Sequence, residues 1–240
     1  MPRKISEVIS RRTDLGTFLV HLTRGDNARA NLESMLRSQA IEARSPFGAA
    51  FRALNDAGLA TDSQKCVCFT ETPLEHGHLL LQEIEGRRLE FAPYGVALPK
   101  KVGRQRGVNP VWYVDITPGH EWLMNPINDL VMTEIRESGF EGSSIEQIAP
   151  FIEQMGTRNE GGPSDYRKEF WWEREWRHRG NIYLPNRLIV LCPEDEIEHF
   201  RDVVDGDEMC PKAAYMDPRW GLEQIIARLA GFSASATDIL

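Results

Sequence analysis

Five short apolar runs constrain the fold of this chain more than any other feature. They are rich in β-branched and aromatic residues, and they predict strands at 17–23, 65–71, 94–99, 111–116 and 187–192. Apolar residues at helical spacing follow the first run, dominate 121–155, and return near 194–204 and 222–229. Because strands and helices do not alternate regularly as they do in βαβ units, this order predicts a mixed α+β fold.

Length and composition predict one soluble domain. A chain of 240 residues with 41% hydrophobic content can build one full core, so we expect a single domain over 1–240 with a helical insertion at about 121–155. That insertion should be broken near Pro126 and at 139–142, and a turn-rich loop at 156–165 is expected to move. The charged N-terminus, the lack of a long apolar stretch and only four cysteines predict a cytoplasmic protein with reduced thiols and no membrane partner.

The net charge restricts the nucleic acids that the chain could bind. At −8, the chain can present only a local basic patch, either from Lys100 to Arg106 or around Arg174, Arg177 and Arg179. The first of these groups also reads as an ordinary solvated loop. The charge therefore argues against tight binding of a duplex and leaves single strands or a protein as partners.

The first strand and the helix after it have a clear pattern of faces. In TFLVHLT, alternation puts Phe18, Val20 and Leu22 on the packed side, and Leu19, His21 and Thr23 on the other. Asp26 is then the expected N-cap of a helix that packs on the sheet, and its packing residues should be Leu32, Met35 and Leu36. His21 and Thr23 could point into a cleft or form a hydrogen-bonded pair in the core.

The segment VCFTETPLE predicts a strand that leads directly into a helix. Thr72 as the cap, Pro73 in the first turn and Glu75 as its partner would form a capping box. Free backbone N–H groups at such a junction suit a phosphate. Thr70 has no such local explanation, and it counts as a candidate binding residue.

The stretch WWEREWR at 171–177 allows two interpretations. If it is extended, Glu173 and Glu175 lie on one face together with Trp171 and Arg177. Two carboxylates so close together need either a chemical role or cationic partners. A dry aromatic wall beside a carboxylate favours an active site, whereas pairing with Arg174 and Arg177 would make the stretch a structural brace. We favour the site.

Other chemistries have weaker signals. Cys66, Cys68, His76 and His78 are four potential zinc ligands, but the two histidines would lie about 200° apart on a helix, so no metal is expected. The chain contains neither a GxGxxG motif nor a P-loop nor a GxSxG elbow. A nuclease stays as an alternative.

Three segments together resemble the marks of ADP-ribosyltransferases. They are VHLTR, CFTET and WEREW, and the first also resembles the start of DarT-type toxins, which modify nucleic acids. The resemblance implies a split sheet with NAD in the cleft and no metal. Glu175 would act on the nicotinamide ribose and Glu173 on the acceptor, and the residues implied to bind NAD are His21, Thr23, Arg24, Phe69, Thr70 and Tyr94. The middle segment departs from the pattern, because a glutamate stands where a small hydroxyl residue is usual.

A second and closer resemblance covers most of residues 18–192. VCFTETPL, YGVALPK, NPVWYVD and KEFWWEREWRHRG are similar to the AbiGi-like family of abortive phage infection. The two resemblances imply different functions. We expect an NAD-dependent ADP-ribosyltransferase that acts as a toxin or phage-defence effector on a nucleic-acid or protein acceptor and is held in check by an antitoxin protein. The alternative is a non-enzymatic antitoxin, in which case Glu175 should be paired with arginine.

Overall fold

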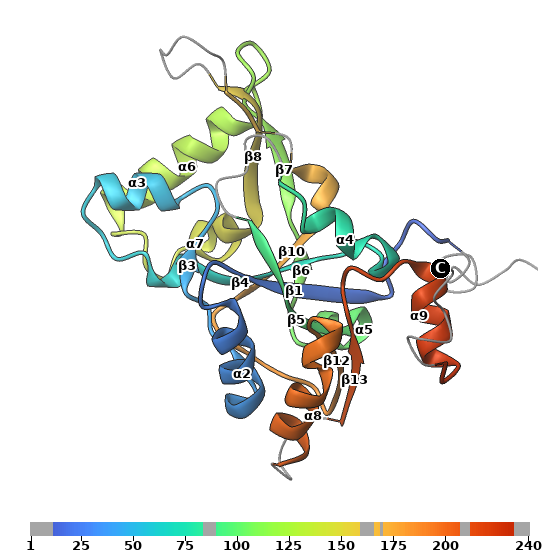
Figure 1. The fold of residues 1–240 in the computed structure, drawn as a ribbon. Helices are drawn as coiled ribbons and strands as arrows, with labels where there is room; N and C mark the ends of the chain where they lie inside the picture. The colour runs from blue at the N-terminus through green and yellow to red at the C-terminus, as the bar shows by residue number, and fades with distance from the viewer. Residues whose placement is uncertain (1–11, 84–89, 159–165, 169, 207–211, 233–240) are drawn as a thin grey trace, which may run out of the picture. The chain divides into compact units, whose positions relative to one another are not determined.

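The computed structural model describes residues 12–83, 90–158, 166–168, 170–206 and 212–232 (Figure 1). Its internal contacts divide the chain into two compact units. Unit 1 consists of Met1–Gln39, Glu71–Val102 and Leu184–Leu240, and unit 2 of Ala40–Thr70 and Gly103–Tyr183. The expected single domain stays a prediction, because a division by contacts does not say whether either unit folds alone.

Unit 1 contains a mixed sheet in the strand order β13-β12-β5-β1. Strands β1 (Phe18–Arg24), β5 (Phe91–Pro99) and β12 (Arg187–Leu191) pair antiparallel, with Val96 opposite both His21 and Val190. Strand β13 (Lys212–Met216), which the sequence analysis missed, pairs parallel to β12. The mixed α+β class is therefore confirmed.

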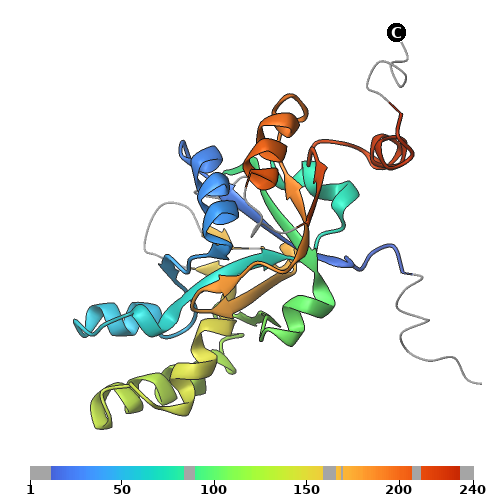
Figure 2. The same ribbon diagram turned by 90° about the horizontal axis from the view of Figure 1, so that it is seen from below.

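Both faces of β1 are covered, so the expected single packed side is wrong. Leu19, on the face expected to be open, is 0% exposed, and Val20 and Leu22 are also buried. Helices α2 (Ala28–Ser38) and α8 (Ile197–Asp205) lie side by side (Figure 2) and pack on this sheet. Leu32, Met35 and Leu36 are buried in α2 as predicted, but the N-cap is Asn27 rather than Asp26, with no capping bond from its side chain.

Contrary to expectation, Thr72 is not the N-cap of the segment after β4 (Lys65–Thr70). Pro73 is itself the N-cap of a single 3₁₀ turn, η2 (Leu74–His76), and the helix α4 that follows spans only Gly77–Leu80. A helix of one turn adds little to a phosphate site, because few peptide dipoles align. The basic segment expected as a loop begins with helix α5 (Lys100–Gln105).

The strands of unit 2 pair in three groups. Strand β4 pairs antiparallel with β10 (Glu175–Arg179), with Glu175 opposite Thr70 and Arg177 opposite Cys68, and β3 (Ser45–Pro46) and β6 (Asn109–Pro110) flank this pair. A second sheet joins three strands, β7 (Trp112–Asp115), β8 (Ile152–Arg158) and β9 (Tyr166–Lys168). The third consists of β2 (Ala40–Ile41) and β11 (Ile182–Tyr183). Most of the expected mobile loop at 156–165 lies outside the described residues.

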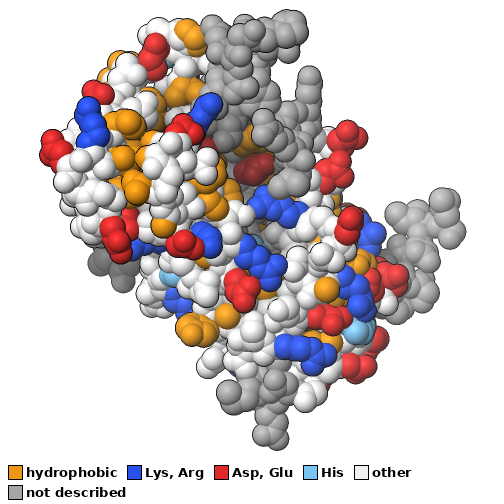
Figure 3. Space-filling view, turned by 90° about the vertical axis from the view of Figure 1, so that its left-hand side faces the viewer, with side chains coloured by type: hydrophobic (Ala, Val, Ile, Leu, Met, Phe, Trp, Pro, Cys, Tyr) orange, Lys and Arg blue, Asp and Glu red, His pale blue; other side chains and the backbone are white. Residues whose placement is uncertain are grey.

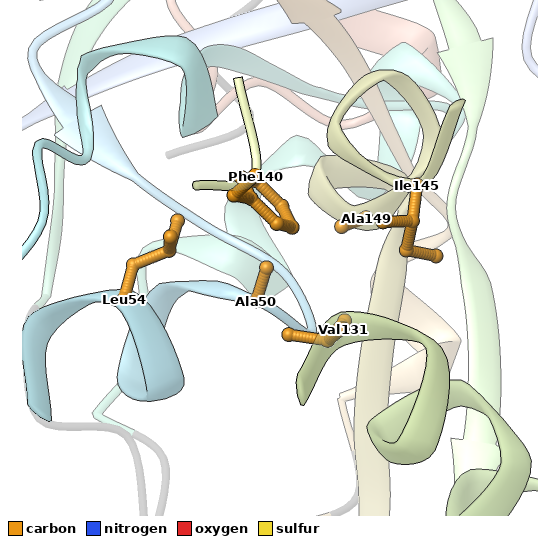
Figure 4. Packing of buried hydrophobic residues seen from close by; sticks show 6 residues of the cluster. All are labelled: Ala50, Leu54, Val131, Phe140, Ile145 and Ala149. Atoms are coloured by element: carbon orange, nitrogen blue, oxygen red, sulfur yellow. The ribbon is translucent and has the colours of Figure 1, made fainter. Parts of the chain in front are cut away.

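Helices α3 (Phe51–Asp56), α6 (Met124–Glu137) and α7 (Ser144–Ile148) share a core in unit 2. Figure 4 shows the six buried side chains of this core: Ala50, Leu54, Val131, Phe140, Ile145 and Ala149. Helix α6 runs through Pro126, contrary to prediction, because proline in the first turn lacks only an N–H that would have no partner inside the helix. The break at 139–142 is confirmed, with Gly139 and Gly142 at positive φ. The expected helical segment ends early, since β8 begins at Ile152.

The remaining elements are short or lie near the C-terminus. They comprise three 3₁₀ turns, η1 (Asp62–Gln64), η3 (Ala149–Phe151) and η5 (Glu194–Glu196), and helix α9 (Leu222–Leu229). The sequence analysis placed α9 correctly. Within the described part of the chain, no helix is both long and apolar enough to cross a membrane.

Candidate functional site

The stretch WWEREWR is not one extended segment, as the sequence analysis assumed. Residues Trp171–Glu173 form a 3₁₀ turn, η4, and Arg174 adopts a left-handed backbone with φ of 48°. Strand β10 begins only at Glu175. Because the chain turns between them, Glu173 and Glu175 do not alternate along one strand, as the extended reading assumed.

Arg177 lies at the centre of a closed polar cluster in unit 2. Its side chain donates from Nε to Glu175 Oε1 at 2.8 Å and from Nη2 to Glu175 Oε2 at 2.9 Å, which makes a two-pronged ion pair. Nη2 also donates to Glu153 Oε2 at 2.6 Å, and Nη1 to the carbonyl of Pro150 at 2.6 Å. The guanidinium carbon lies 4.7 Å from the centre of the Phe47 ring. We call these five residues the Arg177 cluster.

Electrostatics in the Arg177 cluster favour a fixed ion pair. Burial alone would lower the pKa of Arg177, which is only 1% exposed, but the charges of Glu175 and Glu153 hold that pKa well above its ordinary value. Burial and the nearby Glu175 raise the pKa of the Cys68 thiol, and burial raises the pKa of Cys66 to about 11. Both thiols are therefore protonated at neutral pH and are poor nucleophiles.

This geometry answers the question that the sequence left open. Glu175 is paired with arginine through both of its carboxylate oxygens, and the arginine is buried. A carboxylate held in this way links β10 to β8 and η3 through Arg177. The pairing of Glu175 with Arg177 is the arrangement that the bracing interpretation requires, and the sequence analysis did not favour that interpretation.

The other candidate residues in unit 2 are also part of its packing. The hydroxyl of Thr70 donates to the backbone carbonyl of Glu173, so these two candidates do come together, across β4 and η4. Phe69 is 2% exposed inside β4. The Phe69 ring contacts the core of the unit, whereas an aromatic ring that stacks on a ligand needs one face exposed.

The remaining candidates lie in unit 1, where the structure brings Thr23 and Tyr94 together. Thr23 is buried, and its hydroxyl donates to the Tyr94 carbonyl at 2.9 Å. The Tyr94 hydroxyl donates to Glu196 Oε1 at 2.6 Å, and burial together with this carboxylate raises the pKa of Tyr94 to about 12. His21 is half-buried in β1, and Arg24 is exposed at its end. The residues expected to hold NAD are therefore divided between the two units.

The potential zinc ligands are divided in the same way. Cys66 and Cys68 lie in β4 of unit 2, and His76 and His78 in the short helical segment of unit 1. Among the residues that the structure describes, no group of three or more His, Cys, Asp or Glu side chains is placed to hold a metal ion.

Sequence reasoning missed an apolar surface on unit 2. Figure 3 shows hydrophobic side chains gathered over the upper part of one face, where α3, α6 and α7 lie. The large hydrophobic residues exposed on these helices are Phe51, Leu130, Met132 and Ile148, of which Leu130 and Met132 lie about 200° apart around α6, on either side of the buried Val131. Exposed apolar surface of this kind often marks a site of protein binding. Leu130 and Met132 do not belong to the apolar residues of α6 that pack into the core, which include Val131 and Ile135.

Comparison with known proteins identifies the family. The family model described as "Putative abortive phage resistance protein AbiGi, antitoxin" matches residues 33–194, well over half of the chain. The chain belongs to the AbiGi family. The matched range contains all of unit 2, including the exposed apolar residues of α3, α6 and α7 and the Arg177 cluster. No curated protein and no solved structure matches the chain.

Membership of the AbiGi family overturns the main functional prediction. The expected ADP-ribosyltransferase toxin is wrong, because the family is described as an antitoxin, and the closed Glu175–Arg177 pair agrees with the non-enzymatic alternative. The roles given to NAD, to an acceptor and to the NAD-binding residues depended on that prediction and lose their basis with it. The ADP-ribosyltransferase-like form of the fold likewise has no support from any solved structure.

Proposed function

We propose that this chain is the antitoxin of an abortive phage-resistance system, and that it holds a partner toxin inactive by binding it as a protein. The observation that carries the proposal is the match of the AbiGi family over residues 33–194. An antitoxin of this kind needs a stable scaffold and a binding surface, and it needs no catalytic site.

Two features of unit 2 support this proposal. The Arg177 cluster fixes β10 against β8 and η3, so it gives the unit rigidity. Helices α3, α6 and α7 expose Phe51, Leu130, Met132 and Ile148, between 39% and 56% each, while their inner sides already share a core. Burying such side chains against a partner is the main source of affinity at protein interfaces.

Co-expression tests the proposal directly. The product of the gene adjacent to the one that encodes this chain would serve as the candidate toxin and would be induced alone or together with the chain. We expect the toxin alone to stop growth, and the chain to restore it. The two purified proteins should then form a complex of defined stoichiometry in light scattering and calorimetry.

The control is an acidic protein of similar size and charge, which should neither restore growth nor bind. Persistent toxicity with the chain in excess would overturn the antitoxin role. Restored growth without a complex between the purified proteins would overturn the claim that neutralisation occurs by direct binding.

A further inference from the structure

Helix α9 carries an apolar stripe that no core in unit 1 absorbs. Leu222, Ile226 and Leu229 follow one another at the spacing i, i+4, i+7, and we call them the α9 stripe. They are 56%, 55% and 81% exposed, and α9 has no buried residue. Figures 1 and 2 show α9 standing apart from the sheet of unit 1. Phe232, just beyond the helix, is also exposed.

The polar side of α9 is the side that is anchored. Arg228 makes an ion pair with Glu194, and its guanidinium carbon lies 5.3 Å from the centre of the Trp220 ring. Trp220 is buried and donates from Nε1 to the other oxygen of Glu194 at 3.1 Å. A surface helix normally packs its apolar side inward and leaves its charges in water. In α9 the chain holds Arg228 and partly covers Ile225 and Ala227, while Leu222, Ile226 and Leu229 stay exposed.

The ends of α9 are defined by its own sequence. Gln224 Oε1 accepts from the Gly221 N–H at 3.0 Å at the start of the helix. At its end, Gly231 has a φ of 82°, and the N–H groups of Phe232 and Gly231 donate to Ala227 and Arg228 in the pattern of a Schellman motif. A helix that is already formed loses little conformational entropy when it binds.

The charge of the chain indicates which kind of molecule covers the α9 stripe. Glu194, the anchor of Arg228, begins the acidic run EDEIE, in which Asp195 and Glu198 are exposed. The whole chain carries −8, so a second copy would bring like charge to this surface. A basic protein with an apolar groove complements both the stripe and the net charge of the chain, and a helix with anchors at this spacing is a common ligand for such a groove.

We propose that α9 docks its stripe into an apolar groove with a basic rim on the partner toxin. This inference rests on the proposed antitoxin function and adds the binding element and the character of the partner. Helix α9 lies beyond residue 194, where the AbiGi match ends. The α9 stripe would therefore add recognition of a particular toxin to any contacts that residues 33–194 make with it.

The test compares three variants of the full chain in titrations with the purified toxin. Ile226→Gln together with Leu229→Gln keeps good helix formers and the net charge, and it should weaken binding by about 10- to 100-fold. Ile226→Leu should bind nearly as well as wild type, because it keeps an apolar side chain of equal size. Glu223→Gln, on another side of the helix, should change affinity less than about threefold.

Stability and association state complete the test. The double variant should melt at the wild-type temperature, because its side chains are exposed. A clear drop in the melting temperature of the double variant would mean that the stripe packs on its own chain, and it would overturn the inference. The inference would also be overturned if the wild-type chain formed a dimer and the double variant did not. Wild-type affinity in the double variant overturns the role of α9 and leaves the antitoxin role intact, whereas wild-type chain that fails to bind the toxin overturns both.

Discussion

At the scale of single residues, Arg177 determines what the tryptophan-rich stretch does. A buried guanidinium is costly unless its donors are satisfied and its charge is balanced. Arg177 meets both conditions with two carboxylates, a backbone carbonyl and the face of an aromatic ring. Glu175 is therefore committed to Arg177, which makes it a structural residue.

Replacing Glu175 tests this conclusion. Glu175→Gln puts an amide NH₂ group toward Arg177 and removes half of the negative charge that balances it. We expect the free energy of unfolding in urea to fall by about 3 kcal/mol, as is typical when one partner of a buried pair is lost.

The matched control is Glu198→Gln. Glu198 pairs with Arg201 at the surface, where its side chain is 78% exposed, so the substitution should leave the unfolding curve unchanged. Wild-type stability in Glu175→Gln would contradict the bracing role and reopen the question of a chemical one.

At the scale of elements, the pairing of β1 with β5 depends on a close backbone approach at Gly95. This residue lies opposite Leu22 in β1 and opposite Leu191 in β12, so it is central in the sheet of unit 1. A Cβ atom at this position would lie 2.1 Å from the His21 carbonyl oxygen, and backbone atoms cannot yield without moving the strands. Only glycine fits at this point of the register.

Gly95→Ala should therefore destabilise the chain by about 2 kcal/mol or more, as measured by urea unfolding. Gly221→Ala is the matched control, since nothing lies within 4 Å of its added Cβ and alanine in place of glycine at an N-cap should cost less than about 1 kcal/mol. Equal stability of the two variants would show that β5 can shift its register at no cost.

At the scale of the whole molecule, charge is the property that the chain brings to a partner. A net charge of −8 on 240 residues creates a negative field that attracts a basic protein and slows the approach of acidic ones. The exposed apolar residues then supply the short-range contacts. The two contributions are separable, because salt screens the first and leaves the second largely unchanged.

The kinetics of binding to the toxin should show this separation. Raising NaCl from about 0.05 to about 0.5 M should slow association roughly tenfold or more and change dissociation little, because steering acts on the encounter. Stopped-flow mixing at several salt concentrations measures both rates. An association rate that does not depend on salt would remove charge complementarity from the account of the partner.

The sequence by itself determined most of the local structure and the family. The strands near 17–23, 65–71 and 187–192 and the helix at 222–229 form where their periodicity predicts, since a strand or an amphipathic helix is encoded by neighbouring residues. Short helical segments were less predictable. The capping signal at 72–75 yields one 3₁₀ turn, because a helix of only a few residues has too few internal bonds to persist.

Only the tertiary structure decided what the candidate site is. An extended reading of residues 173–175 is what their sequence suggests, whereas the structure has a 3₁₀ turn that ends in a left-handed residue, Arg174, before strand β10 begins. Glu153 and Pro150, which complete the Arg177 cluster, lie 24 and 27 positions earlier in the chain. The attachment of α9 depends likewise on Glu194, 34 positions before Arg228. Such contacts join distant segments by packing and charge, and no local pattern records them.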